Sequence, residues 1–150
     1  MVQYQADSSG AAHAPSRYGR FLLALVSQNK PHKGVNELLL AFARYAERQA
    51  KTNEALGLVL AGYGITTDLQ NQIRRLHPAI AERVHVLGAV SEETRQQLIA
   101  SCAALAVPSR AEGCCLPALE AHRAGQVVVC RPVPALLELL TPYDFVTKDM

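Results

Sequence analysis

The chain has 150 residues, of which 49% are apolar, and a formal net charge of +2 at pH 7. This length suits one domain that buries about 68–70% of its unfolded surface, and the apolar content excludes a disordered chain. The small net charge argues against a nucleic-acid surface. No apolar run approaches the roughly 18 residues of a membrane span, so we expect a soluble, globular domain.

The four cysteines show no Cys-x-x-Cys spacing, and Cys114 and Cys115 are adjacent. Adjacent cysteines rarely form a structural disulfide, so we expect reduced thiols and a cytoplasmic protein. Cys102 and Cys130 are expected to act as small buried apolar residues. The histidines lack metal-binding spacings, and we therefore expect no metal site.

Residues 1–18 are rich in Ser, Ala, Gly and Pro without periodicity, which predicts a linker or disordered tail before a domain over residues 19–150. Short apolar runs then alternate with amphipathic stretches. The expected strand and helix pairs are residues 21–26 with 35–49, 56–61 with 68–76, 84–87 with 92–101, 104–107 with 117–124, and 127–130 with 135–140. Five such pairs predict an α/β fold, a Rossmann-like parallel sheet with helices on both faces.

Local signals support two of the helix starts. Residues 34–37 open the first helix, and an apolar stripe follows from Leu38 to Ala46. Ser91 is a good N-cap residue followed by acidic residues in the first turn. Doubly wound sheets bind ligands beyond the carboxyl ends of their strands. The candidate site loops are therefore residues 27–34, 62–67, 88–91, 108–116 and 131–134.

The loop after the first strand places Lys30 and Lys33 beside Gly34 and a helix start. A lysine there can act as a point charge on a phosphate, while the glycine allows close backbone approach. A solvated loop with a helix-start glycine would explain the same residues. In the second loop, Gly62 begins a Gly-x-Gly that lacks the third glycine of a dinucleotide fingerprint.

A short loop, Gly113 to Leu116, lies between Glu112 and Glu120 and leads into a helix that Pro117 starts. Such a helix start exposes backbone N–H groups and suits an anion such as diphosphate. Glu120 can accept hydrogen bonds from a vicinal diol, and Glu112 can reach a second polyol group on the same ligand. This pattern indicates a nucleotide-sugar, although a loop acid and a helix acid favoured by the helix dipole would also explain the pair.

Together these segments resemble the carboxyl-terminal, donor-binding domain of retaining GT-B glycosyltransferases, the glycosyl transferases group 1 family. The resemblance covers about residues 20–140. It is carried by Lys33-Gly34, by Gly62-Tyr63-Gly64, by residues 84–91, and above all by the run PSRAEGCCLPALEA at residues 108–121. The order and spacing of these segments are far more specific than any one of them.

The resemblance implies a role for each candidate residue. Lys33 would neutralise the donor diphosphate, Glu112 would contact the transferred sugar, and Glu120 would bind the ribose hydroxyls. The amides of Cys114, Cys115 and Leu116 would lie beside the sugar and phosphates, and the remaining expected donor-binding residues are Lys30, Gly34, Gly62 and Gly113. By the same resemblance, a nucleotide-diphosphate sugar would be the donor substrate, in a pathway such as polysaccharide biosynthesis, and no separate cofactor is expected.

Three departures from the family pattern weaken this expectation. Gln28 stands where the family has a phosphate-binding arginine, unless Lys30 substitutes; Cys115 adds a Cβ where backbone should approach the sugar; and Ala135 replaces a glycine. Only a short tail precedes the first strand, and the chain stops at Met150, so we expect a fragment truncated at its C-terminus.

Such a fragment would need an acceptor-binding domain, in cis or in trans, and the full-length enzyme would be cytoplasmic and peripheral to the inner face of the membrane. Two alternatives stay open. One is a non-catalytic nucleotide-sugar-fold module that serves as a binding or scaffold partner. The other is a GT-B nucleotide-sugar epimerase.

Overall fold

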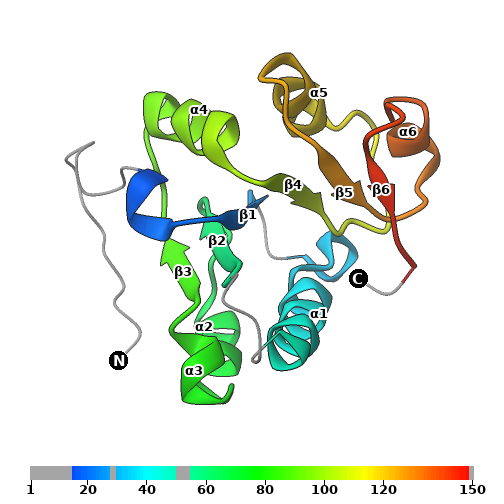
Figure 1. Ribbon diagram of the computed structural model, residues 1–150. Coiled ribbons are helices and arrows are strands. Elements are labelled where there is room, and N and C mark those ends of the chain that lie inside the picture. The colour runs from blue at the N-terminus through cyan, green and yellow to red at the C-terminus, as the bar shows by residue number, and fades with distance from the viewer. Residues whose placement is uncertain (1–14, 28–29, 50–54, 149–150) are drawn as a thin grey trace.

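The computed structural model describes residues 15–27, 30–49 and 55–148, and its centre is a parallel β-sheet (Figure 1). Every strand pair within the described residues runs parallel, in the spatial order β3-β2-β1-β4-β5-β6. All five residues of β2 are buried, as expected for a strand covered on both faces. The strands are β1 Phe21–Leu25, β2 Gly57–Ala61, β3 Val84–Leu87, β4 Ala104–Val107, β5 Val128–Cys130 and β6 Phe145–Val146.

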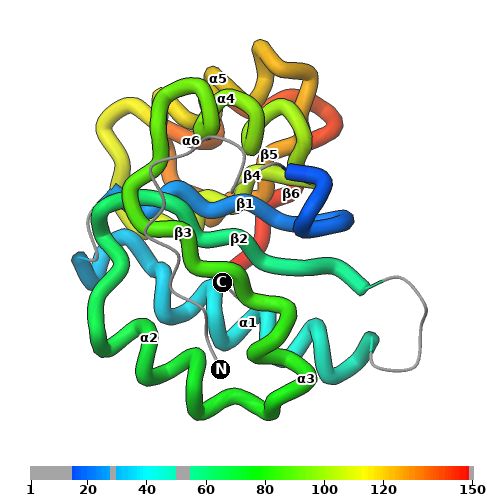
Figure 2. The backbone as a smooth tube through the Cα atoms, turned by 90° about the vertical axis from the view of Figure 1, so that its left-hand side faces the viewer, coloured from blue at the N-terminus to red at the C-terminus, as the bar shows by residue number. Residues whose placement is uncertain are grey.

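Helices cover both faces of this sheet. The α-helices are α1 Val35–Arg48, α2 Thr67–Arg74, α3 Pro78–Ala81, α4 Glu92–Ser101, α5 Leu116–Arg123 and α6 Pro134–Leu137. Figures 1 and 2 show α1, α2 and α3 on one face and α4, α5 and α6 on the other, and the buried apolar residues form two matching clusters. The α/β, Rossmann-like prediction is confirmed. No helix in the described ranges is long and apolar enough to cross a bilayer.

Some elements were not predicted or differ in length from the prediction. Both residues of the strand β6 are exposed, so the sequence shows no alternating pattern there. Backbone pairing with β5 defines this strand, and the Thr147 amide donates a hydrogen bond to the Cys130 carbonyl at 2.9 Å. The helix α3 is one short turn started by proline. The predicted helix at residues 135–140 is too long, because α6 ends at Leu137.

The amino-terminal end of the fold also differs in detail from the expectation. Residues Pro15–Tyr18 form a 3-10 helix within the segment predicted as a tail, and the Tyr18 ring lies 5.8 Å from that of Phe21 and 5.0 Å from that of His85, between ring centroids. For residues 1–14, which lie outside the described residues, the tail stays a prediction.

A buried carboxylate ties the carboxyl-terminal part of the fold together. The Asp144 side chain is 1% exposed and accepts hydrogen bonds from the Val128 amide at 2.6 Å and from the Thr141 amide at 2.7 Å. It also lies 2.9 Å from Nε2 of His122 in α5. Burial opposes its ionisation, but the amide and hydroxyl donors and His122 outweigh burial and lower the pKa of Asp144. Asp144 therefore links α5, β5 and the segment that leads into β6.

Candidate functional site

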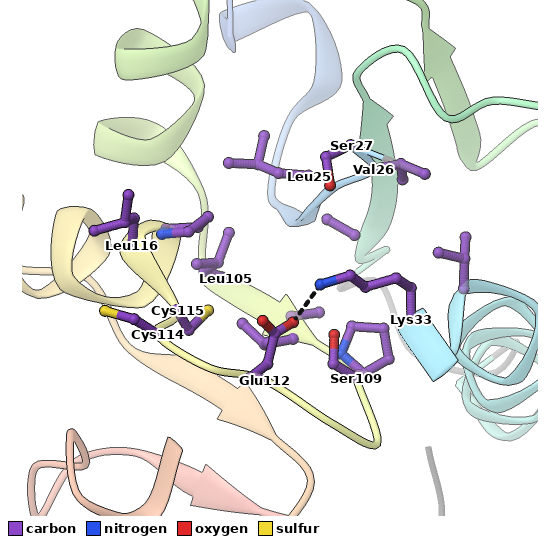
Figure 3. A pocket seen from close by; sticks show the side chains of 16 residues that line it. Leu25, Val26, Ser27, Lys33, Leu105, Ser109, Glu112, Cys114, Cys115 and Leu116 are labelled. Atoms are coloured by element: carbon purple, nitrogen blue, oxygen red, sulfur yellow. Dashed lines mark hydrogen bonds and ion pairs between the residues drawn. The ribbon is translucent and has the colours of Figure 1, made fainter. Parts of the chain in front are cut away.

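A pocket of about 300 Å³ lies at the carboxyl ends of β1 and β4 (Figure 3). The strand order reverses between these two neighbours, and doubly wound sheets bind ligands in the crevice at such a point. Ser27 and Ser109, which the sequence analysis did not select, add hydroxyl groups to the lining. The lining residues are Ala24–Ser27, Lys33, Val35, Leu105–Ser109, Glu112 and Cys114–Pro117.

The two predicted catalytic residues meet in this pocket. Figure 3 shows Lys33 and Glu112 pointing toward one another, with 2.9 Å between Nζ and Oε1. Their side chains are 27% and 12% exposed, so the pair is partly shielded from water. An incoming anion would therefore meet an ammonium group that already has a carboxylate partner.

Close backbone contact between two loops brings this pair together. Gly34 has a φ of 67°, and a Cβ at this position would lie 2.2 Å from the carbonyl oxygen of Pro108. The Arg110 amide donates to the His32 carbonyl at 2.7 Å, and the Arg110 guanidinium pairs with Glu37 of α1. Because only glycine fits this approach, Gly34 serves loop packing and is not among the pocket-lining residues.

The start of α5 forms another wall of the pocket. Leu116 is 61% exposed and Cys114 is exposed, whereas Cys115 is buried with the core residues around it. Burial raises the pKa of the Cys115 thiol. The Cys115 side chain thus has a place in the core, and Cys115 is also one of the residues that line the pocket.

The backbone donors at this helix start are not all available. The Leu116 amide donates to the Cys114 carbonyl at 3.2 Å. Among the described residues, no group accepts a hydrogen bond from the amides of Cys114 or Cys115. These two amides, and not all three that were predicted, are the N–H groups that a bound anion could use.

Glu120 lies one turn beyond the pocket, on α5, and is not among the lining residues. Its carboxylate forms a two-point pair with Arg95 of α4, with 2.8 Å between Nη2 and Oε1 and a second contact between Nη1 and Oε2. Arg95 also binds Glu92, at 2.9 Å from Nε and 2.7 Å from Nη2. Hydrogen bonds with Glu120 and Glu92 raise the pKa of Arg95. The Ser91 cap of α4 was predicted from the sequence, whereas Arg95 was not among the predicted site residues.

The other predicted site residues line no part of the pocket. Gly62 has a φ of 133°, and a Cβ there would lie 2.3 Å from the Val26 carbonyl oxygen, so backbone packing requires this glycine. A Cβ at Gly113 would meet nothing within 4 Å. Lys30 is exposed, and its backbone carbonyl accepts a hydrogen bond from the Lys33 amide at 2.9 Å. Gln28 lies outside the described residues.

The cysteines are free thiols, and Cys102 and Cys130 are buried, which confirms their predicted place in the core. Burial raises the pKa of Cys102 to about 11. Within the described part of the chain, no group of three or more His, Cys, Asp or Glu residues is placed to hold a metal ion.

The comparisons with known proteins assign the family. A family model described as glycosyl transferases group 1 matches residues 13–149. The chain belongs to this family. One relative is the MMP alpha-(1->4)-mannosyltransferase of Mycolicibacterium hassiacum. It is 34% identical to this chain over 122 residues, which are 81% of this chain and 28% of that protein.

Solved structures of two other proteins share the fold. Anabaena Alr3699/HepE in complex with UDP-glucose matches with a TM-score of 0.70 at 24% identity, over 96% of this chain and 40% of that one. WaaG, a glycosyltransferase of lipopolysaccharide biosynthesis, matches with a TM-score of 0.66 at 19% identity, over 90% and 36% of the two chains. The chain thus spans less than half the length of the relatives it matches.

Proposed function

We propose that this chain is the donor-binding domain of a retaining glycosyltransferase, which holds a nucleotide-diphosphate sugar and transfers the sugar when an acceptor-binding domain is present. The proposal includes a cytoplasmic location, where the thiols stay reduced, and a place in polysaccharide biosynthesis. One observation carries it: in a member of the glycosyl transferases group 1 family, Lys33 and Glu112 meet in the pocket where the strand order reverses.

The residues of the pocket suit the chemistry of such a donor. In the proposed complex, Lys33 leaves Glu112 and binds the diphosphate, while Glu112 accepts hydrogen bonds from the sugar hydroxyls. The amides of Cys114 and Cys115 lie at the positive end of α5 and add donors for the phosphates. Fixed positive charge stabilises the departing nucleoside diphosphate as an oxocarbenium-like sugar forms, which lowers the barrier.

The named relatives support a nucleotide-sugar as the donor. HepE was solved with UDP-glucose, and the Mycolicibacterium relative is named a mannosyltransferase. We therefore choose UDP as the first nucleotide to test, and glucose and mannose as the first two sugars.

A second candidate is a non-catalytic binding or scaffold module of the same fold. It is favoured by the ion pairs that already occupy three proposed ligand-binding side chains, Lys33, Glu112 and Glu120. Gln28, where the family has arginine, favours it as well. A module of this kind would keep nucleotide binding but gain no transfer activity from an acceptor-binding domain.

Calorimetry with UDP, UMP, ADP and AMP tests the proposal on the purified chain. We expect a diphosphate to bind more tightly than its monophosphate, because Lys33 and the start of α5 converge on a two-phosphate anion. Lys33→Met should weaken diphosphate binding by about 1.5–3 kcal/mol, the range for a hydrogen bond to a charged group.

Arg74→Met is the matched control, since Arg74 lies on α2, on the opposite face from α5, and is exposed. This variant removes one positive charge but should leave diphosphate affinity unchanged. Equal affinities for diphosphates and monophosphates, or equal losses in Lys33→Met and Arg74→Met, would contradict the proposal.

A further inference from the structure

The guanidinium of Arg95 holds two carboxylates from two helices. It binds Glu120 of α5 through both terminal nitrogens, and it binds Glu92 in the first turn of its own helix α4. The Arg95 side chain is 24% exposed and that of Glu120 is 34% exposed, whereas Glu92 is 63% exposed. The contact between Arg95 and Glu120 is thus the more shielded of the two.

This contact restricts how the Glu120 carboxylate is oriented. A glutamate on a helix surface has several free rotatable bonds, and a fork-to-fork pair with arginine fixes both its position and its plane. Glu120 follows Leu116 by one turn and Pro117 by three residues, so it lies on the side of α5 that continues the pocket wall. The carboxylate is therefore held on the helical turn that follows the pocket-lining residues before any ligand arrives.

The pair leaves Glu120 able to accept further hydrogen bonds. A carboxylate has about four acceptor positions, and Arg95 uses one on each oxygen. The remaining positions can accept two hydroxyl donors, which is the number that a vicinal diol supplies. Arg95 has no acceptor of its own and could not replace Glu120 in this contact.

We propose that Arg95 is a positioning residue for nucleotide recognition: it holds the carboxylate of Glu120 so that both of its oxygens accept hydrogen bonds from the 2′ and 3′ hydroxyls of a ribose. The inference rests on the proposed function and extends it to a residue outside the pocket. Arg95 touches neither the sugar nor the phosphates in this arrangement. Its effect on binding should therefore depend on the ribose diol alone.

The test measures how much each variant prefers a ribonucleotide to the same nucleotide without the diol. UDP, ADP and GDP are first screened against the unmodified chain by calorimetry, and the tightest binder is then compared with its 2′,3′-dideoxy analogue. We expect the unmodified chain to prefer the ribonucleotide by about tenfold or more. In Arg95→Met the preference should fall below about threefold, with the affinity for the dideoxy analogue unchanged.

Two further variants separate positioning from a general structural role. Arg95→Lys keeps the charge beside Glu120 but lacks the planar fork, so it should fold normally and show an intermediate preference. Glu92→Gln removes the other partner of Arg95 and leaves the Glu120 contact, so it should keep the full preference. Melting temperatures of all variants are recorded beside the affinities.

Three results would overturn the inference while leaving the proposed function intact. An unchanged ribose preference in both Arg95 variants would show that Glu120 needs no partner. A parallel loss of affinity for the ribonucleotide and its dideoxy analogue would show that Arg95 acts only through stability. Loss of the preference in Glu92→Gln would assign the effect to the α4 surface and not to the Glu120 contact. If the unmodified chain binds none of the three diphosphates, the proposed function fails first, and the inference fails with it.

Discussion

Lys33 and Glu112 stabilise one another in the pocket, and the same pair opposes the entry of an anion. The carboxylate is 12% exposed, so it competes with a phosphate for the ammonium group in surroundings that screen charge less than open water does. Under the proposed function, the balance between these two partners would set how tightly the pocket holds a nucleotide.

Glu112→Gln should therefore tighten the binding of a nucleoside diphosphate. Removing the charge frees Lys33 and removes a negative group near the phosphates, and we expect a gain of about 1 kcal/mol, roughly fivefold in affinity. Calorimetry with UDP measures it. Glu82→Gln is the control, because Glu82 is exposed beside α3 and its change alters the net charge equally. Weaker UDP binding in Glu112→Gln would mean that Glu112 itself supports the phosphate contact.

Among the structural elements, the loop after β1 and the loop after β4 depend on one glycine for their close approach. Gly34→Ala should lower the free energy of unfolding by about 2–4 kcal/mol, since the left-handed φ and the contact with the Pro108 carbonyl both oppose a side chain. Urea unfolding followed by circular dichroism measures this change.

Gly113→Ala provides the comparison within the same pair of loops. A Cβ at Gly113 would meet nothing within 4 Å, so we expect a change of about 0.5 kcal/mol or less. If Gly34→Ala lowered the free energy of unfolding as little as Gly113→Ala does, the two loops would have moved apart to fit the new side chain without a measurable loss of stability.

The link between α5, β5 and the segment before β6 should depend on pH through Asp144. Its folded-state pKa lies below the ordinary 3.8, so its stabilisation is fully present above that value and is lost as the pH falls through the lower, folded pKa. Asp144→Asn should cost about 1–3 kcal/mol at neutral pH, because it breaks the contact with His122 and weakens the amide contacts.

The measurement is urea unfolding of both proteins between neutral pH and about pH 2. The difference in unfolding free energy between them should shrink below pH 3.8 as Asp144 takes up a proton. A difference that stays constant over this range would show that the charge of Asp144 contributes nothing to stability.

For the molecule as a whole, the proposed function makes the pocket one wall of a site whose other wall would be an acceptor-binding domain. The pocket lies at the carboxyl edge of the sheet, and under this proposal a sugar bound there would have no positioned acceptor. We expect this chain alone to show no measurable sugar transfer and to gain transfer when it is joined to a matching acceptor-binding domain. Positioning of two reactants accounts for about 7–11 kcal/mol of a barrier.

The measurement is transfer of a radiolabelled sugar to a defined acceptor, by the chain alone and by the joined protein, with a no-enzyme control. Transfer by the chain alone would contradict the two-domain proposal. A joined protein that binds nucleotide but transfers nothing would favour the non-catalytic module.

Local sequence patterns were sufficient to predict the sheet and most of its helices. The strands Val84–Leu87 and Ala104–Val107 and the helix Glu92–Ser101 begin and end where predicted. In α4 the Ser91 hydroxyl accepts a hydrogen bond from the Thr94 amide, as its N-cap sequence indicates. These features depend on residues within a few positions of one another, so periodicity and capping reveal them.

The partners of the charged residues became known only from the folded chain. Lys33 meets Glu112 across 79 positions, Arg95 meets Glu120 across 25, and His122 meets Asp144 across 22. The sequence indicated that several of these residues belong to a site, but it could not show that each carboxylate already has a side-chain partner. A pattern of neighbours along the chain holds no information on such pairs, because packing of the helices and crossing of the strands set the distances between them.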